Sequence, residues 1–396
     1  MSDSSVSAPS RMPTWIKGMV PLLLLAGLVV AFVRVGPLGV FKRAFPPVEA
    51  LTVQRIALPR AGEMRVHVVN GGPEPVTVAQ VLVDDAAWSH TMDGGKTLGR
   101  LESRVITLPY PWVEGEPHVV TLVTSTGLTF EGTIPVATQT PSPDARYVTT
   151  FALLGLYAGV IPVFLGLLWF PFLRTVRREW LDFFLSLTIG LLLFLGGEAL
   201  AEAFETAARV PGAFNGLGII LIGTLATSLS LAAFGRRRAR TDGTRTAYYV
   251  AMLIAIGIGL HNLGEGLAIG TSYATGQIAL GTFLVIGFLL HNTTEGLGIL
   301  APLAKEQPRL GQLALLGALA GIPTIVGTWI GGFSYSPVWT TLFLAVGAGA
   351  IAQVVLELWR LFAKRAQAGG LASPRNVAGL LAGLGIMYVT GLLVPA

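Results

Sequence analysis

The chain has 396 residues, of which 52% are hydrophobic and 12% are charged. Soluble domains carry about 25% charged residues, so this composition places most of the chain in a lipid bilayer. The absence of cysteine excludes disulfides, thiolate zinc sites, iron–sulfur ligation and cysteine nucleophiles. Membrane topology accounts for the net charge of +5, so nucleic-acid binding is not indicated.

The N-terminal part, residues 1–47, predicts a cytoplasmic tail and one anchor helix. The apolar stretch Gly18–Val33 follows Arg11 and Lys17 and has no small-residue cleavage site, which favours an uncleaved signal anchor. Cleavage before Pro46 is the alternative.

Residues 48–140 change in character and predict a small extracytoplasmic β-domain. Runs rich in Val, Thr and Ile are separated by Gly, Pro and Asn turn signals, a spacing typical of an immunoglobulin-like β-sandwich. The stretch Thr138–Asp144, which contains two prolines, reads as a linker. The expected strands are Leu51–Leu58, Glu63–Val69, Val76–Val83, Arg104–Leu108, His118–Val123 and Leu128–Val136.

Residues 141–396 predict a polytopic helical core. Eight apolar stretches are each close to the ~20 residues that a spanning helix needs. Lys and Arg collect in alternate loops, which places those loops in the cytoplasm and both ends of the core, with the β-domain, outside. The expected spans are 148–172, 181–205, 212–234, 247–270, 277–302, 311–332, 338–360 and 376–394.

Two copies of one motif, His-Asn-x-x-Glu-Gly-Leu, lie thirty residues apart in the fourth and fifth core spans. They begin at His261 and His291. Residues four apart share a helix face, so His261 lies with Glu265, and His291 lies with Glu295. The short connection between the spans makes them antiparallel, which puts both motifs at a similar depth. Two imidazoles and two carboxylates then suit a divalent ion such as Zn²⁺, Fe²⁺ or Mn²⁺.

Energetic cost supports a functional role for these residues. A carboxylate at mid-membrane costs roughly 2.5–3.5 kcal/mol and persists mainly beside a cavity, a partner or an ion. The alternative is that each His–Glu pair only satisfies itself by hydrogen bonding. Three further intramembrane carboxylates, Glu198, Glu202 and Glu357, are candidates for an ion pathway, although Glu357 could instead pair with Arg360. Three histidines of the β-domain, His67, His90 and His118, are scattered singly and are expected to bind no metal.

The motif pair resembles the ZIP family of divalent metal transporters, and most of all its bacterial GufA-like branch. The resemblance covers residues 148–396. It implies an eight-helix core that imports metal through a site between its fourth and fifth helices. It also implies that His261, Glu265, His291 and Glu295 form the principal site, and that Asn262 and Asn292 line an adjacent second position.

The sequence departs from the family pattern in three places. Gly264 and Thr294 stand where the family has proline, so a helix kink must arise differently. Thr324 stands where a glutamate often serves the second metal position, which predicts one well-formed site. The family's second-helix His-x-x-x-Glu is Glu198-x-x-x-Glu202 here, a harder oxygen pair.

These observations predict a multi-pass protein of the bacterial inner membrane that moves a divalent metal, most plausibly zinc, toward the cytoplasm by alternating access. The metal is cargo, no cofactor is expected, and a homodimer is left open. One rival hypothesis is a metal-binding membrane sensor or scaffold without transport. The other is an intramembrane metalloenzyme, which the absence of a His-Glu-x-x-His motif disfavours.

Overall fold

The computed structural model describes residues 14–35, 48–242, 247–365 and 373–392. The chain divides into two units, Met1–Glu49 and Ala50–Ala396. In the first unit a single helix, α1 (Thr14–Val35), covers the predicted anchor, and its leucines are exposed. Residues Arg11, Lys42 and Arg43, on which the orientation of the anchor depends, lie outside the described residues.

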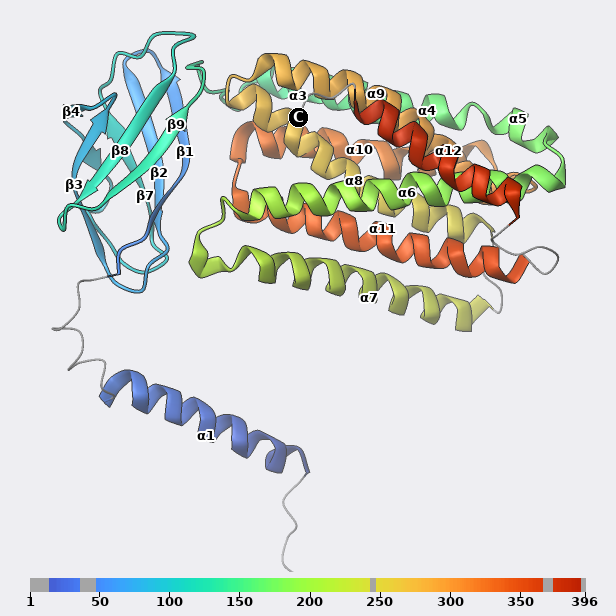
Figure 1. Cartoon of the computed structure of the whole chain (residues 1–396), viewed down its shortest axis with the longest axis horizontal. Coiled ribbons are helices and arrows are strands. Elements are labelled where there is room, and N and C mark those ends of the chain that lie inside the picture. The colour runs from blue at the N-terminus through green and yellow to red at the C-terminus, as the bar shows by residue number, and fades with distance from the viewer. Residues whose placement is uncertain (1–13, 36–47, 243–246, 366–372, 393–396) are drawn as a thin grey trace, which may run out of the picture. The chain divides into compact units, whose positions relative to one another are not determined.

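The β-domain is built from two antiparallel sheets (Figure 1). One sheet has the strand order β1-β2-β7-β5, and the other has the order β4-β3-β8-β9 with β6 paired to β3. Alternate residues of both sheets, such as Val66, Ile106, Val81 and Leu122, form a common buried core. The strands are β1 (Leu51–Arg60), β2 (Glu63–Asn70), β3 (Val76–Val83), β4 (Ala86–Trp88), β5 (Thr91–Met92), β6 (Thr97–Leu98), β7 (Ser103–Leu108), β8 (His118–Thr124) and β9 (Thr129–Ile134).

The segment predicted as a linker is tied to the β-domain by hydrogen bonds. Thr140 forms two hydrogen bonds with Leu58 of β1. The N–H of Thr140 donates to the Leu58 carbonyl, and the N–H of Leu58 donates to the Thr140 hydroxyl. Gln139 donates to the carbonyl of Pro59. Asp144 then caps the first core helix by accepting from the N–H of Tyr147. Hydrogen bonds at both ends of the linker therefore restrict its backbone.

Seven stretches of the described residues are long and apolar enough to cross a membrane, and they agree with the first seven predicted spans to within a few residues. The eighth, 376–394, is helical over Pro374–Gly391 but is not among the seven, and residues 393–396 lie outside the described chain. The seven are Ala145–Thr175, Trp180–Ala207, Gly212–Ala233, Ala247–Ala274, Ile278–Leu303, Leu310–Ser334 and Pro337–Arg360.

The first of these spans is broken in the middle. A π-helical turn, η1 (Leu156–Val160), separates α3 (Ala145–Gly155) from α4 (Ile161–Leu167), and α5 (Phe170–Thr175) follows. Pro162 has no N–H with which to bond the carbonyl of Ala158. The remaining core helices are α6 (Arg178–Ala207), α7 (Gly216–Asp242), α8 (Ala247–Ala274), α9 (Ile278–Leu300), α10 (Leu310–Ser334), α11 (Pro337–Arg365) and α12 (Pro374–Gly391).

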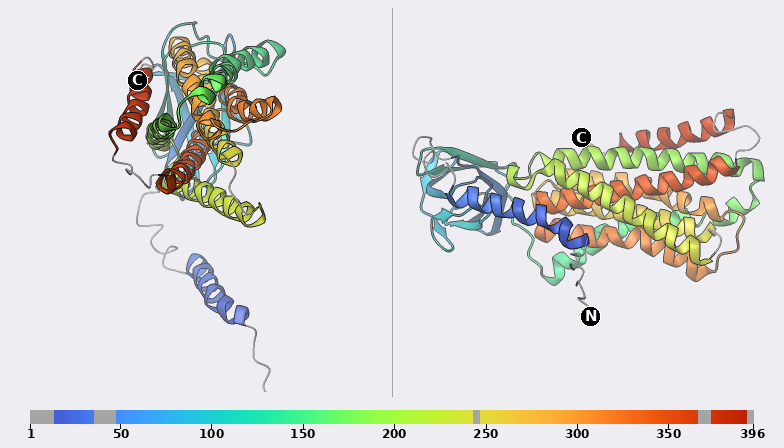
Figure 2. Two further views of the ribbon diagram at one scale, coloured as in Figure 1. Left: turned by 90° about the vertical axis from the view of Figure 1, so that its right-hand side faces the viewer. Right: turned by 90° about the horizontal axis from the view of Figure 1, so that it is seen from below.

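The core helices pack as two groups. The site group contains α3, α4, α8, α9 and α10, and the α6 group contains α6, α7, α11 and α12; α8 and α11 make the main contact between them. In Figures 1 and 2, α7 lies at the edge of the bundle. Within an apolar stretch of 18 residues in the span Gly212–Ala233, only 11% of the residues are buried inside the protein.

Glycines bring the backbones of the site group into contact. A Cβ at Gly266 of α8 would lie 2.2 Å from the carbonyl oxygen of Thr324 on α10, and one at Gly296 of α9 would lie 2.3 Å from that of Val163 on α4. Small residues permit such approach in membranes, where packing replaces the hydrophobic effect as the force between helices. Each motif helix therefore packs closely against a neighbour, α8 against α10 and α9 against α4.

Candidate metal centre

Three of the predicted donors converge between α8 and α9. His261, Glu265 and His291 each offer one ligand atom within 4.8 Å of the others. The Oε1 atom of Glu265 lies 3.4 Å from Nε2 of His261 and 3.5 Å from Nε2 of His291. The two imidazole rings stack with their centroids 6.2 Å apart and their planes 8° apart. The two motifs therefore lie at one depth, as their spacing predicts.

The fourth predicted donor, Glu295, lies at the border of this cluster. Its Oε1 atom is 3.8 Å from Nε2 of His291, and it is not one of the three mutually close donors. Both of its carboxylate oxygens are buried without a hydrogen-bond partner among the described residues. A small displacement of this side chain would complete a set of two imidazoles and two carboxylates.

The two asparagines of the motifs hold the centre in place. Asn292 donates to Oε2 of Glu265 at 2.8 Å and to the carbonyl of Ala158 at 2.8 Å. Asn262 donates to the carbonyl of Ala320 at 3.1 Å. Since Asn292 engages Oε2, the other oxygen of Glu265 is left facing the two histidines.

The centre is closed to solvent and rich in unpaired acceptors. His261, Glu265, His291 and Glu295 are 3–6% exposed, and both asparagines are fully buried. Besides Glu295, Oε1 of Glu265, Nε2 of His291 and Oδ1 of both asparagines have no hydrogen-bond partner in the part of the chain that the structure describes. Buried polar atoms without partners are costly and rare in native proteins. A divalent cation would satisfy several of these atoms at once.

Thr324 occupies the place where the family resemblance leads us to expect a carboxylate for a second metal. Thr324 is fully buried on α10, and its hydroxyl lies where a Cβ on Gly159 would clash, 2.0 Å away. That hydroxyl has no hydrogen-bond partner among the described residues. A neutral hydroxyl cannot replace a bridging carboxylate, so the prediction of a single well-formed site stands as a prediction.

The two carboxylates of α6 lie near the centre. Glu198 is exposed and Glu202 half-buried, and each interacts electrostatically with His261 and Glu265. Both lie at about the depth of the centre, since Ala203 of α6 and Gly264 of α8 are both next to Leu344 of α11. Glu205, one turn further on, forms an exposed ion pair with Arg209. A pathway role for Glu198 and Glu202 remains a prediction.

Glu357 lies on α11, within a buried polar network. It accepts hydrogen bonds from Gln353 at 3.0 Å and from Arg360 at 3.2 Å. The pairing with Arg360, the alternative expected from the sequence, is therefore present. A pathway role for Glu357 remains a prediction.

The histidines of the β-domain do not gather into a site. Burial and the charges of Arg55 and Arg65 lower the pKa of His67 to about 4, so its unprotonated Nε2 can accept from Arg55 at 3.4 Å. His118 pairs with Asp84 at 2.8 Å.

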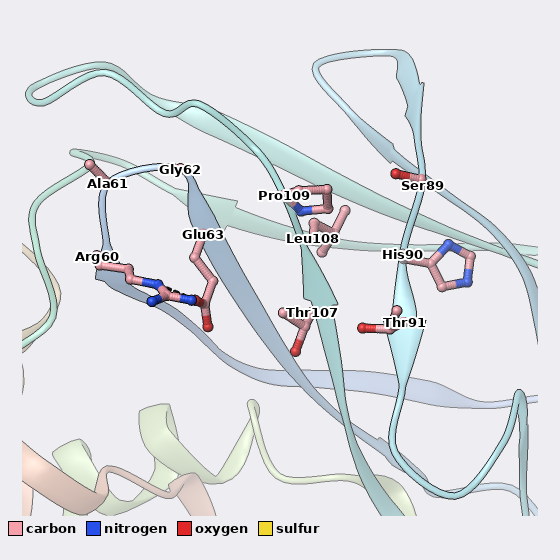
Figure 3. A pocket seen from close by; sticks show the side chains of 10 residues that line it. All are labelled: Arg60, Ala61, Gly62, Glu63, Ser89, His90, Thr91, Thr107, Leu108 and Pro109. Atoms are coloured by element: carbon pink, nitrogen blue, oxygen red, sulfur yellow. Dashed lines mark hydrogen bonds and ion pairs between the residues drawn. The ribbon is translucent and has the colours of Figure 1, made fainter.

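His90 lines a pocket of about 730 Å³ in the β-domain. Its ring lies at one side of this pocket, and the Arg60–Glu63 ion pair lies at the other (Figure 3). These side chains therefore offer no convergent set of ligands.

Sequence reasoning missed the backbone groups that complete the centre. The carbonyls of Ala158 and Ala320 carry no side-chain signal, but Pro162 was a clue, because a proline leaves the carbonyl four residues earlier without its helical partner. Phe288, whose ring meets His291 edge-on at 6.1 Å, was also missed. It lies three residues before His291 on the same face of α9.

Comparison with known proteins agrees with this geometry over part of the chain. No curated protein matches the chain. Residues 233–391, less than half of the chain, match the family described as ZIP zinc transporter. This matched region contains both motifs and the whole of α8 to α12. Together with the seven apolar spans, the match indicates an integral, multi-pass membrane protein whose metal-centre region is similar to ZIP zinc transporters.

Proposed function

We propose that the chain transports divalent transition-metal cations through the centre between α8 and α9. The observation that carries the proposal is the convergence of His261, Glu265 and His291 inside apolar helices, with unpaired acceptors around them. Imidazole nitrogen and carboxylate oxygen together suit Zn²⁺, and also Fe²⁺ or Mn²⁺. The metal is the cargo of this site.

The packing of the helices supports alternating access. The donors belong to the site group, whose members are joined by close glycine contacts. His261 also borders the α6 group, since a Cβ at Gly347 of α11 would lie 3.2 Å from the Cα of His261. Movement of the site group along this boundary would expose the centre first to one side of the membrane and then to the other. Glu198 and Glu202, at the depth of the centre, would assist the entry of the ion, and Glu357 would line its exit toward the cytoplasm.

The rival functions lack this support. In a hydrolytic zinc site a metal-bound water attacks the substrate, and each motif helix here supplies one histidine where zincins supply two. A sensor or scaffold would bind the metal without moving it, and the residues of the centre do not distinguish this possibility.

Uptake of Zn²⁺ and Mn²⁺ into vesicles containing the purified protein tests the proposal. Glu265→Ala and Glu295→Ala should each reduce uptake by about a hundredfold or more, since each removes a charged ligand that nothing else replaces. Glu205→Ala, which removes an exposed glutamate of the same bundle, is the matched control and should behave as wild type. Unchanged uptake in both site variants would refute the assignment. Metal binding without uptake by the wild type would favour the sensor.

A further inference from the structure

The β-domain contacts both helix groups at the end of the bundle where α3 begins. Toward the site group, Arg55 donates to the carbonyl of Phe333, in the last turn of α10, at 3.2 Å. Gly276, in the turn between α8 and α9, approaches the segment after β9 so closely that a Cβ there would lie 2.7 Å from the Thr138 hydroxyl. Toward the α6 group, a Cβ at Gly71 would lie 3.3 Å from the Cβ of Pro211, in the loop before α7.

These contacts differ in strength. The attachment to the site group is covalent through residues 138–144, which are hydrogen-bonded to β1. It is reinforced by the Arg55 guanidinium on a helix C-terminal carbonyl, where a positive charge is favoured. The contact of Gly71 with Pro211 is, by comparison, a van der Waals touch between two turns. The β-domain is thus fixed to one group and rests against the other.

We propose that the β-domain moves with the site group and that its Gly71 turn must leave Pro211 each time the metal centre changes sides. This inference rests on the proposed transport function. It gives the β-domain a mechanical role, because the β-domain is fixed to the site group and lies against the α6 group. No metal or other ligand of the β-domain is required.

The absence of cysteine from the chain makes a direct test possible. In the double variant Gly71→Cys/Pro211→Cys the two Cβ atoms would lie close to the ~3.5–4.5 Å separation of a disulfide. Oxidation would tie the two groups together through the β-domain. The matched control is Thr77→Cys/Thr97→Cys, a registered cross-strand pair within the β-domain whose hydroxyls are 2.8 Å apart.

The first readout is Mn²⁺ uptake by vesicles with and without reductant. Oxidised Gly71→Cys/Pro211→Cys should lose about tenfold or more of its uptake because the conformational step is blocked, and reductant should restore it. The control pair should transport equally in both states. Full uptake by the oxidised Gly71→Cys/Pro211→Cys protein would overturn the inference.

The second readout needs no transport. Mn²⁺ should change the rate of disulfide formation between positions 71 and 211 by about threefold or more, since a ligand that prefers one arrangement shifts the population. The effect should vanish when Glu265→Ala is added, and the control pair should show none. If Mn²⁺ left the rate of disulfide formation unchanged in protein shown to bind it, the proposed movement of the Gly71 turn away from Pro211 would be contradicted. Absence of uptake by the wild type, together with a Mn²⁺-dependent rate in the Gly71→Cys/Pro211→Cys variant, would instead contradict the transport function.

Discussion

Asn292 shows how one residue can define a metal centre without carrying charge. Its two N–H donors are spent on Glu265 and on the carbonyl of Ala158. The first bond fixes which carboxylate oxygen faces the histidines, and the second anchors α9 to the π-helical turn. Its own Oδ1 remains unpaired among the described residues. The motif's asparagine is thus a positioning group in this arrangement.

Asn292→Ala should weaken Mn²⁺ binding by about 10- to 100-fold, the usual effect of removing a group that orients a metal ligand. Glu265 would lose its fixed orientation, and the Ala158 carbonyl would lose a donor. Isothermal titration of the purified protein measures the change. Gln277→Ala, an exposed amide at the start of α9, should bind Mn²⁺ as wild type does, and equal affinities of the two variants would exclude a positioning role.

Glycines determine how closely the helices of the centre can pack against their neighbours. Gly266 follows the motif glutamate of α8, and the backbone of α10 occupies the space where a side chain would lie. Gly264, where the family has proline, is in contact with Leu344: a Cβ there would lie 2.9 Å from its Cδ2. Both α8 and α9 are uninterrupted α-helices, whereas the first span is interrupted by η1, just before Pro162.

Gly266→Ala should destabilise the protein by about 1–3 kcal/mol, because overpacking against a backbone forces the helices apart. Thermal unfolding in detergent, followed by fluorescence, measures the loss. Gly385→Ala on α12 is the matched control, since nothing lies within 4 Å of a Cβ there. It should be neutral or raise stability by up to about 1 kcal/mol. Equal melting temperatures would show that the α8–α10 contact is looser than described.

At the scale of the whole molecule, the distribution of Lys and Arg over the loops predicts the orientation in the membrane. The end of the bundle that meets the β-domain carries few Lys and Arg in its loops, and the opposite loops carry many. Among these basic residues, Arg245 lies outside the described residues. The positive-inside rule therefore predicts that the β-domain lies outside the cytoplasm.

Single cysteines test this orientation in the cysteine-free chain. Lys96→Cys, in an exposed turn of the β-domain, should react with a membrane-impermeant maleimide on intact cells. Glu306→Cys, in the exposed loop between α9 and α10, should react only after the cells are opened. The opposite pattern of labelling would reverse the direction proposed for the pathway.

The sequence alone predicted most of the helices and strands and named the candidate donors. Twenty-residue apolar spans leave little choice of secondary structure in a membrane, since each backbone group must find its partner within the helix. The i,i+4 spacing of His261 with Glu265, and of His291 with Glu295, predicted one donor face on each helix. The strands β4, β5 and β6 escaped prediction because two or three residues are too few to show alternation.

Tertiary structure decided how these parts are combined. Which glycine meets which carbonyl, which helix supplies Ala158 or Ala320, and which loops the β-domain touches are contacts between residues far apart in the sequence, and no local pattern encodes them. Local periodicity fixes the face of a helix, but the partner of that face depends on the packing of all the others. The donors could therefore be named from the sequence, whereas the single oxygen of Glu265 that faces both histidines emerged only from the fold.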